Sequence, residues 1–172
     1  TTRKNAQIQI DANTYAQVGE VQVKGFELGV SGNVTPQWQV FGGYAYMDSE
    51  LVRGAYTNVN QGDPLANTPK HTFSAFTTYK VTRAISLGGG AYYVSKSLGG
   101  NQGGAGGGTN RIYAPSYWRY DAFASWAVSK NADLQLNVQN LTDERYIVRT
   151  NGVHHADPTP GRQAMLTLNV KY

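Results

Sequence analysis

Hydrophobic and polar side chains alternate along the end of the chain. One set of alternate positions holds Leu166, Leu168, Val170 and Tyr172, and the other holds Met165, Thr167, Asn169 and Lys171. Successive side chains of a β-strand point to opposite faces, so the pattern predicts a strand over 162–172 with one apolar and one polar face. A terminal aromatic residue in register favours a strand whose apolar face meets lipid and whose polar face meets a watery lumen.

Similar alternation predicts seven earlier strands, over 3–11, 17–34, 38–52, 71–79, 85–95, 117–128 and 134–148. The segment 117–128 is the clearest of these, with Trp118, Tyr120 and Trp126 on one face and Arg119 and Asp121 on the other. We expect the segment 134–148 to run as one strand through a bulge near 140–143. No segment has a helical period over three turns.

The lengths of the connections predict the topology. Counting back from the C-terminus, they are long, short, long, short, long, short and then moderate. In an antiparallel meander all the long loops then lie at one end and all the short turns at the other, as in outer-membrane barrels. The sequence therefore predicts an all-β fold, an antiparallel transmembrane β-barrel meander of about eight strands. A soluble β-sandwich or lipocalin-like barrel is the alternative.

Composition agrees with a wall of strands. The 172 residues include 12 Tyr and 20 Gly but no Cys, and the mean hydropathy is only -0.45. A barrel wall places every second residue towards its lumen, so low hydropathy is compatible with a membrane. No run approaches the roughly 18 apolar residues of a membrane helix. The absence of Cys excludes disulfides and thiolate chemistry and is compatible with an exported protein.

Charge and the first residues add two expectations. The formal net charge is +4, but the basic residues are scattered, so we expect no nucleic-acid partner. The chain begins Thr-Thr-Arg-Lys, without Met or an apolar signal segment. We expect either a processed leader or a piece of a longer protein.

Several segments resemble one family. Residues 140–146, Asn-Leu-Thr-Asp-Glu-Arg-Tyr, resemble a segment near the end of TonB-dependent outer-membrane receptors, and residues 160–172 are similar to the C-terminal signature of that family. Residues 35–48 and 69–73 add support in the family's order and spacing. The chain departs from the pattern at Thr142 and Tyr172, where Phe is usual.

The resemblance implies most of the functional expectations. It implies a segment, residues 1–172, from the C-terminal part of a 22-stranded barrel, with the plug domain and the earlier strands absent from this chain. It implies uptake of ferric siderophores, of the catecholate kind, across the outer membrane of a Gram-negative bacterium. Energy would come from the TonB complex through the missing N-terminal region, outer-membrane lipid would surround the wall, and iron would be cargo with no other cofactor. Leu168, Val170 and Tyr172 would form a barrel-assembly signal.

Five residues are candidates for ligand contact in the long loops: His154, His155, Arg111, Tyr113 and Trp118. Arg111 and Tyr113 could offer a cation and a ring to an anionic aromatic chelate. Tyr113 and Trp118 could equally belong to an interfacial aromatic belt, and the histidines could be solvated loop residues. Adjacent strand residues point to opposite faces and the third histidine, His71, is distant, so we expect no metal site at the His pair.

We expect no catalytic residues, because no nucleophile elbow or metal–carboxylate cluster occurs. Asp143, Glu144 and Arg145 are consecutive, so local salt bridges are the default interpretation. Two other functions stay open: a freestanding eight-stranded outer-membrane barrel with a structural or adhesive role, and a soluble β-barrel that binds a lipid or ligand.

Overall fold

The computed structural model describes residues 1–9, 15–54, 60–99, 111–151 and 155–171. Eight strands form one antiparallel sheet in the order β1-β2-β3-β4-β5-β8-β9-β12. Their bounds are β1 Thr2–Gln9, β2 Tyr15–Asn33, β3 Trp38–Arg53, β4 His71–Lys80, β5 Ile85–Val94, β8 Tyr117–Ser129, β9 Ala132–Gln139 and β12 Gln163–Val170. The predicted all-β antiparallel meander is confirmed, and β1 and β12 are the edges of an open strip that is a partial barrel.

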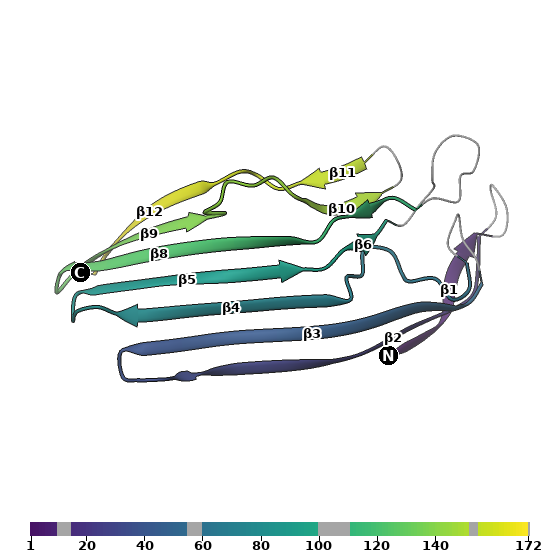
Figure 1. Ribbon diagram of the computed structural model, residues 1–172, viewed down its shortest axis with the longest axis horizontal. Coiled ribbons are helices and arrows are strands. Elements are labelled where there is room, and N and C mark those ends of the chain that lie inside the picture. The colour runs from purple at the N-terminus through teal and green to yellow at the C-terminus, as the bar shows by residue number, and fades with distance from the viewer. Residues whose placement is uncertain (10–14, 55–59, 100–110, 152–154, 172) are drawn as a thin grey trace.

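Figure 1 shows the strands side by side in a single curved layer, with tight turns at one end and long connections at the other. The alternation of long and short connections is therefore confirmed. Within the described residues, no helix is long and apolar enough to span a membrane.

Four short strands at the long-connection end escaped the sequence analysis. β6 (Ser97–Leu98) pairs with β7 (Tyr113–Ala114), and β10 (Ile147–Asn151) pairs with β11 (His155–Pro158). The prediction of one continuous strand over 134–148 was wrong, because β9 ends at Gln139 and β10 belongs to a separate sheet. Asn140 and Asp143 adopt left-handed backbone angles, φ 54° and 58°, which interrupt the ladder.

The strand register sorts the side chains into two faces, because directly opposed residues share a face. The first face, here called the apolar face, has rows such as Leu28–Tyr44–Phe73–Tyr93–Trp118 and Ile85–Trp126–Leu134–Leu168. The alternate positions form the polar face, with Glu27, Ser74, Arg119, Asn137 and Thr167 among them. The predicted two-faced C-terminal strand is confirmed over 163–170, and Tyr172 lies outside the described residues.

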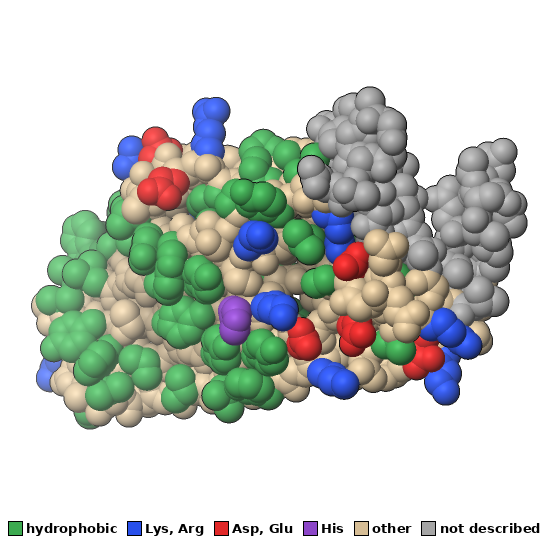
Figure 2. Space-filling model, turned by 45° about the vertical axis from the view of Figure 1, so that its right-hand side comes forward, with side chains coloured by type: hydrophobic (Ala, Val, Ile, Leu, Met, Phe, Trp, Pro, Cys, Tyr) green, Lys and Arg blue, Asp and Glu red, His purple; other side chains and the backbone are tan. Residues whose placement is uncertain are grey.

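The apolar face is open to the surroundings. Leu166 is 65% exposed and Leu28 63%, whereas Leu51 and Ala114 are the hydrophobic residues found buried in the described part of the chain. Figure 2 shows a broad field of hydrophobic side chains on the half of the molecule away from the long connections. The polar face also has an aromatic exception, since Phe76 and Phe123 stack with ring centroids 5.7 Å apart. A sheet that exposes so much apolar surface suits lipid on that side.

Candidate functional site

Three long connections meet at one point, here called the loop junction: Asn67, Leu98, Gly99, Arg111 and Thr150. The Asn67 side-chain amide donates to the Thr150 carbonyl (3.2 Å) and accepts from the Thr150 N–H (3.3 Å). The Asn67 N–H donates to the Leu98 carbonyl at 2.7 Å. Thr150 is only 3% exposed. Asn67 of the β3–β4 connection therefore joins the β5–β8 connection through its backbone N–H and the β9–β12 connection through its side chain.

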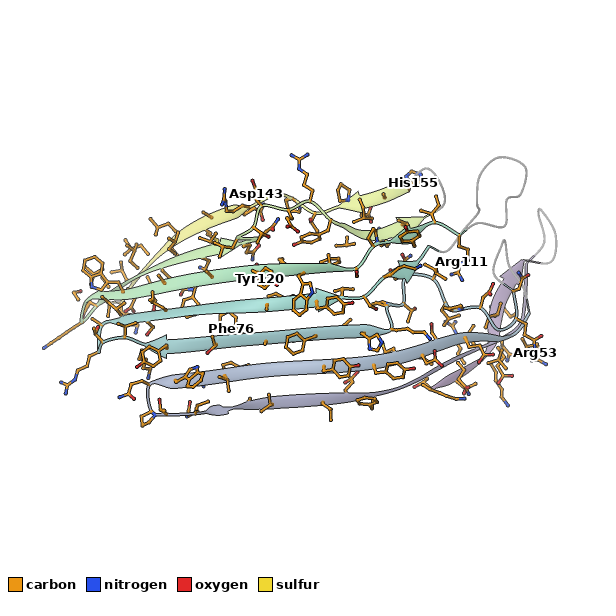
Figure 3. All side chains as sticks on the ribbon, viewed as in Figure 1. Arg53, Phe76, Arg111, Tyr120, Asp143 and His155 are labelled. Atoms are coloured by element: carbon orange, nitrogen blue, oxygen red, sulfur yellow. The ribbon has the colours of Figure 1, made fainter. Side chains whose placement is uncertain are left out.

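Arg111 belongs to this junction. Its Nε donates to the Gly99 carbonyl (3.0 Å) and its Nη1 to the Pro64 carbonyl (2.7 Å). Its buried Nη2 has no hydrogen-bond partner among the described residues. Figure 3 places Arg111 at the end of the sheet where the long connections meet. Nη1 thus joins the β5–β8 connection to the β3–β4 connection, and Nε bonds within the β5–β8 connection. The role of Arg111 as a ligand contact stays a prediction.

Two other loop candidates lie in short strands, Tyr113 in β7 and His155 in β11. Tyr113 is half exposed, with Lys96 Nζ 4.6 Å from its ring centroid. His155 begins β11, is exposed and pairs with Asn151, and Figure 3 shows it near the tip of that hairpin. His154 lies outside the described residues. No contact of Tyr113 or His155 tests its predicted role in ligand binding.

Trp118 lies on the apolar face. Its ring centroid is 4.9 Å from that of Tyr93 and 6.0 Å from that of Tyr120. On the same face, Tyr44 and His71 are joined by a 2.7 Å hydrogen bond between the phenol oxygen and Nδ1. The position of Trp118 on the apolar face favours a place in the interfacial aromatic belt over contact with a ligand. No group of three His, Cys, Asp or Glu residues suited to a metal ion occurs in the described segments.

The polar face holds a set of residues that the sequence analysis did not select, here called the Arg119 cluster: Tyr92, Tyr117, Arg119, Asp121 and Tyr146. The Arg119 guanidinium carbon lies 4.3 Å from the centroid of the Tyr92 ring. Arg119 Nη2 lies 2.9 Å from Asp121 Oδ2. Arg119 Nε is buried without a hydrogen-bond partner among the described residues. The guanidinium is therefore held in a fixed position between Tyr92 and Asp121.

Two tyrosines lie beside this cation. The rings of Tyr117 and Tyr146 stack with centroids 4.2 Å apart and an interplanar angle of 7°. Burial raises the pKa of the Tyr146 phenol above its usual value, against the lowering effect of nearby Arg119, so the phenol is neutral at physiological pH. A cation beside neutral aromatic rings can bind a planar anionic group. The sequence alone could have indicated this cluster through strand alternation. Trp118 and Arg119 are adjacent in the strand, so if Trp118 faces lipid, Arg119 faces the other side of the sheet.

Residues 140–146 and 160–162 form a hydrogen-bonded link, here called the clasp, between β9 and β12. Asn140, 3% exposed, donates through Nδ2 to the carbonyls of Glu144 (2.7 Å) and Pro160 (3.3 Å). Asp143 Oδ1 accepts from the Arg162 N–H at 2.6 Å, and Figure 3 places Asp143 where the chain leaves the main sheet. The expectation of local salt bridges among residues 143–145 was wrong, because the ion-pair partner of Asp143 is Arg162, at 4.0 Å.

Comparison with known proteins gives consistent matches. The family model described as "TonB dependent receptor-like, beta-barrel" matches residues 1–141. The chain is 43% identical to the probable TonB-dependent receptor BfrD of Bordetella pertussis over 99% of this chain and 23% of that protein. It is 35% identical to the catecholate siderophore receptor Fiu of Escherichia coli over 100% of this chain and 22% of that protein.

Solved structures agree. The crystal structure of the siderophore receptor PiuA from Acinetobacter baumannii matches with a TM-score of 0.86 and 40% identity, over 100% of this chain and 25% of that one. The closed form of the ferric-catecholate import receptor Fiu matches with a TM-score of 0.83 and 35% identity, over 98% of this chain and 24% of that one. The chain thus spans about a quarter of the length of these relatives.

Proposed function

The chain belongs to the TonB-dependent receptor family, and on that premise we propose that it forms the C-terminal part of the barrel wall of a receptor for ferric siderophores. It lies in the outer membrane of a Gram-negative bacterium. The apolar face meets lipid, the polar face meets the lumen, and the long connections lie outside the cell.

One observation carries the siderophore assignment. The whole two-faced sheet superimposes on the siderophore receptor PiuA with a TM-score of 0.86. The freestanding eight-stranded barrel is not favoured, because the sheet has two edges and corresponds to only part of larger barrels. TonB supplies the energy, ferric siderophore is the cargo, and the protein acts as a receptor and not as an enzyme.

We place a ligand-contacting surface at the Arg119 cluster. Arg119 faces the lumen by strand register, its side chain is 37% exposed, and Tyr92 lies beneath its guanidinium. A ferric catecholate is anionic and carries planar rings, so it suits charge-assisted hydrogen bonds and stacking at this surface. This support makes the catecholate subtype our preferred ligand class.

Ligand binding tests this surface. In the protein purified at its natural length, we expect Arg119→Ala to weaken binding of a radioactive ferric–catechol complex by about tenfold to a hundredfold, as for a lost charged hydrogen bond. Tyr146→Leu, which leaves the ion pair between Arg119 and Asp121 intact, should also weaken binding. Lys130→Ala, in the short turn at the opposite end, is the control. Unchanged affinity in both Arg119→Ala and Tyr146→Leu would exclude this surface.

The mass of the native polypeptide tests the assignment to a longer receptor. An antibody against the C-terminal segment should detect a band in isolated outer membranes several times larger than the 18.7 kDa of this chain. A band near 18.7 kDa would instead establish a small independent barrel. Loss of iron uptake on deletion of the gene, restored by a plasmid copy, separates the transport role from mere size.

A further inference from the structure

A groove crosses the apolar face over four strands. In β4, β5 and β8 the register places small side chains side by side, Ala75 opposite Ala91 and Gly89 opposite Ala122. Larger side chains border this band, with Tyr120 and Leu141 towards the loop end and Trp38 towards the short turns. The resulting groove has a volume of about 550 Å³, within the ~300–1,000 Å³ range of small-molecule sites.

Thr77, a polar residue among those that line the groove, already has hydrogen-bond partners. Thr77 Oγ1 accepts from the Trp38 indole N–H at 2.7 Å and donates to the Gln39 carbonyl at 3.1 Å. These bonds also hold the Trp38 ring at the wall of the groove. Since the hydroxyl has both a donor and an acceptor partner, the groove suits a purely apolar occupant.

The position of the groove within the membrane follows from the aromatic residues on the same face. Tyr93 and Trp118 lie towards the loop end, and Tyr79 and Trp126 lie towards the short turns. Aromatic belts mark the two membrane interfaces, so the band between them faces hydrocarbon. The groove lies on β3, β4, β5 and β8, each of which pairs on both sides, so its shape does not depend on the edges of the sheet.

The nearest turn carries positive charge. Arg83 lies in the turn before β5, and the chain has no Asp or Glu over 77–89. Arg83 is exposed, whereas Lys80, opposite Ser86, belongs by register to the polar face. β5 begins beside this turn at Ile85, which is four residues from Gly89 in the groove, or about 13 Å along the strand. This is shorter than half of the ~30 Å hydrocarbon thickness, so one lipid can reach both places.

We propose that this groove binds an acyl chain of a phospholipid from the periplasmic leaflet, whose phosphate lies at Arg83. This lipid site rests on the outward-facing wall alone and is separate from the lumen surface assigned to the siderophore. The hydrocarbon fills the band of small residues, and the Arg83 guanidinium favours an anionic headgroup. The occupant is a lipid molecule retained through purification, not the general contact of a wall with its bilayer.

Lipid retention tests the proposal. The protein is purified from outer membranes at its natural length in mild detergent, and bound phospholipid is measured by mass spectrometry after extraction. We expect Ala75→Leu/Ala91→Leu, which fills the groove, to reduce retained phospholipid by about tenfold, the equivalent of roughly two excluded methylene groups. Arg83→Gln should also reduce retention. Ala164→Leu, on the same face in β12 but outside the groove, should leave retention unchanged.

Three results would overturn the site: equal retention by the wild type and the filled variant, retention of lipid A in place of phospholipid, or disulfide-linked dimers of Ala91→Cys that show a second copy in the groove. Cross-linking of the wild type avoids dependence on folding of the variants. A phospholipid with a photoreactive acyl chain should label residues 75–77 and 89–91 above residues 164–168. Equal labelling of residues 75–77, 89–91 and 164–168 would be a fourth result that rejects the proposal.

Discussion

The clasp between β9 and β12 leaves no room for a side chain at Gly161. A Cβ at this residue would lie 2.8 Å from Asp143 Oδ1, which already accepts the Arg162 N–H. We expect Gly161→Ala to destabilise the barrel by about 0.5–3 kcal/mol, through disturbance of that bond. Gly32→Ala is the matched control, because no atom lies within 4 Å of its Cβ. The unfolding temperature is measured from the gel mobility of heated samples. Equal unfolding temperatures for the two variants would refute this role of Gly161.

Residue identity alone could not reveal the contacts of the loop junction. Asn67 and Thr150 are 83 residues apart, and no periodicity relates them. Arg111 was selected for its charge, yet its Nε and Nη1 bind carbonyls of two connections. Arg119 was assigned to the polar side of its strand, but its neighbours come from other segments: the register places Tyr92 opposite it, and the β9–β10 connection brings Tyr146 beside it.

Asn67 is the residue through which the junction is tested. Asn67→Ala removes both side-chain bonds to Thr150, so we expect hydrogen exchange at amides 147–151 to accelerate by about tenfold. Asn60→Ala, in the same connection but outside the junction, should leave this exchange unchanged. Slow exchange that persists in Asn67→Ala would show that β10 is held by other contacts.

At the scale of the strand, alternation predicted the faces well and the strand ends poorly. The two sides assigned to 117–128 and 166–170 agree with the observed pairs. The end of β9 was missed because Asn140 leaves the ladder through its own backbone angle and side-chain bonds, which no hydropathy pattern encodes. Short strands such as β6 and β7 contain too few residues to show a period.

The two faces of β12 predict unequal tolerance of charge. Leu166→Arg places a guanidinium on the lipid side, where it costs about 2–4 kcal/mol near the membrane centre. Thr167→Arg, the next residue, points to the lumen and should change stability by less than about 1 kcal/mol. Urea unfolding of the protein in phospholipid vesicles measures both. A larger loss for Thr167→Arg would reverse the assignment of the faces.

At the scale of the whole molecule, the connections define an inside and an outside. The chain has no cysteine, so single cysteines report position without interference from this segment. We expect a membrane-impermeant maleimide to label Gln61→Cys, in the β3–β4 connection, on intact cells. Asn131→Cys, in the short β8–β9 turn, should react only after the cells are opened. Labelling of Asn131→Cys on intact cells would invert the proposed orientation.

The unbroken register between β3 and β5 also constrains how such a wall can change length. These pairs run from Trp38–Tyr79 to Lys80–Ser86 without a shift. One residue inserted into β4 would move every following side chain to the opposite environment, whereas two residues would restore the original sides. Insertions and deletions in the strands of related proteins should therefore occur in even numbers, while the long connections can accept any number.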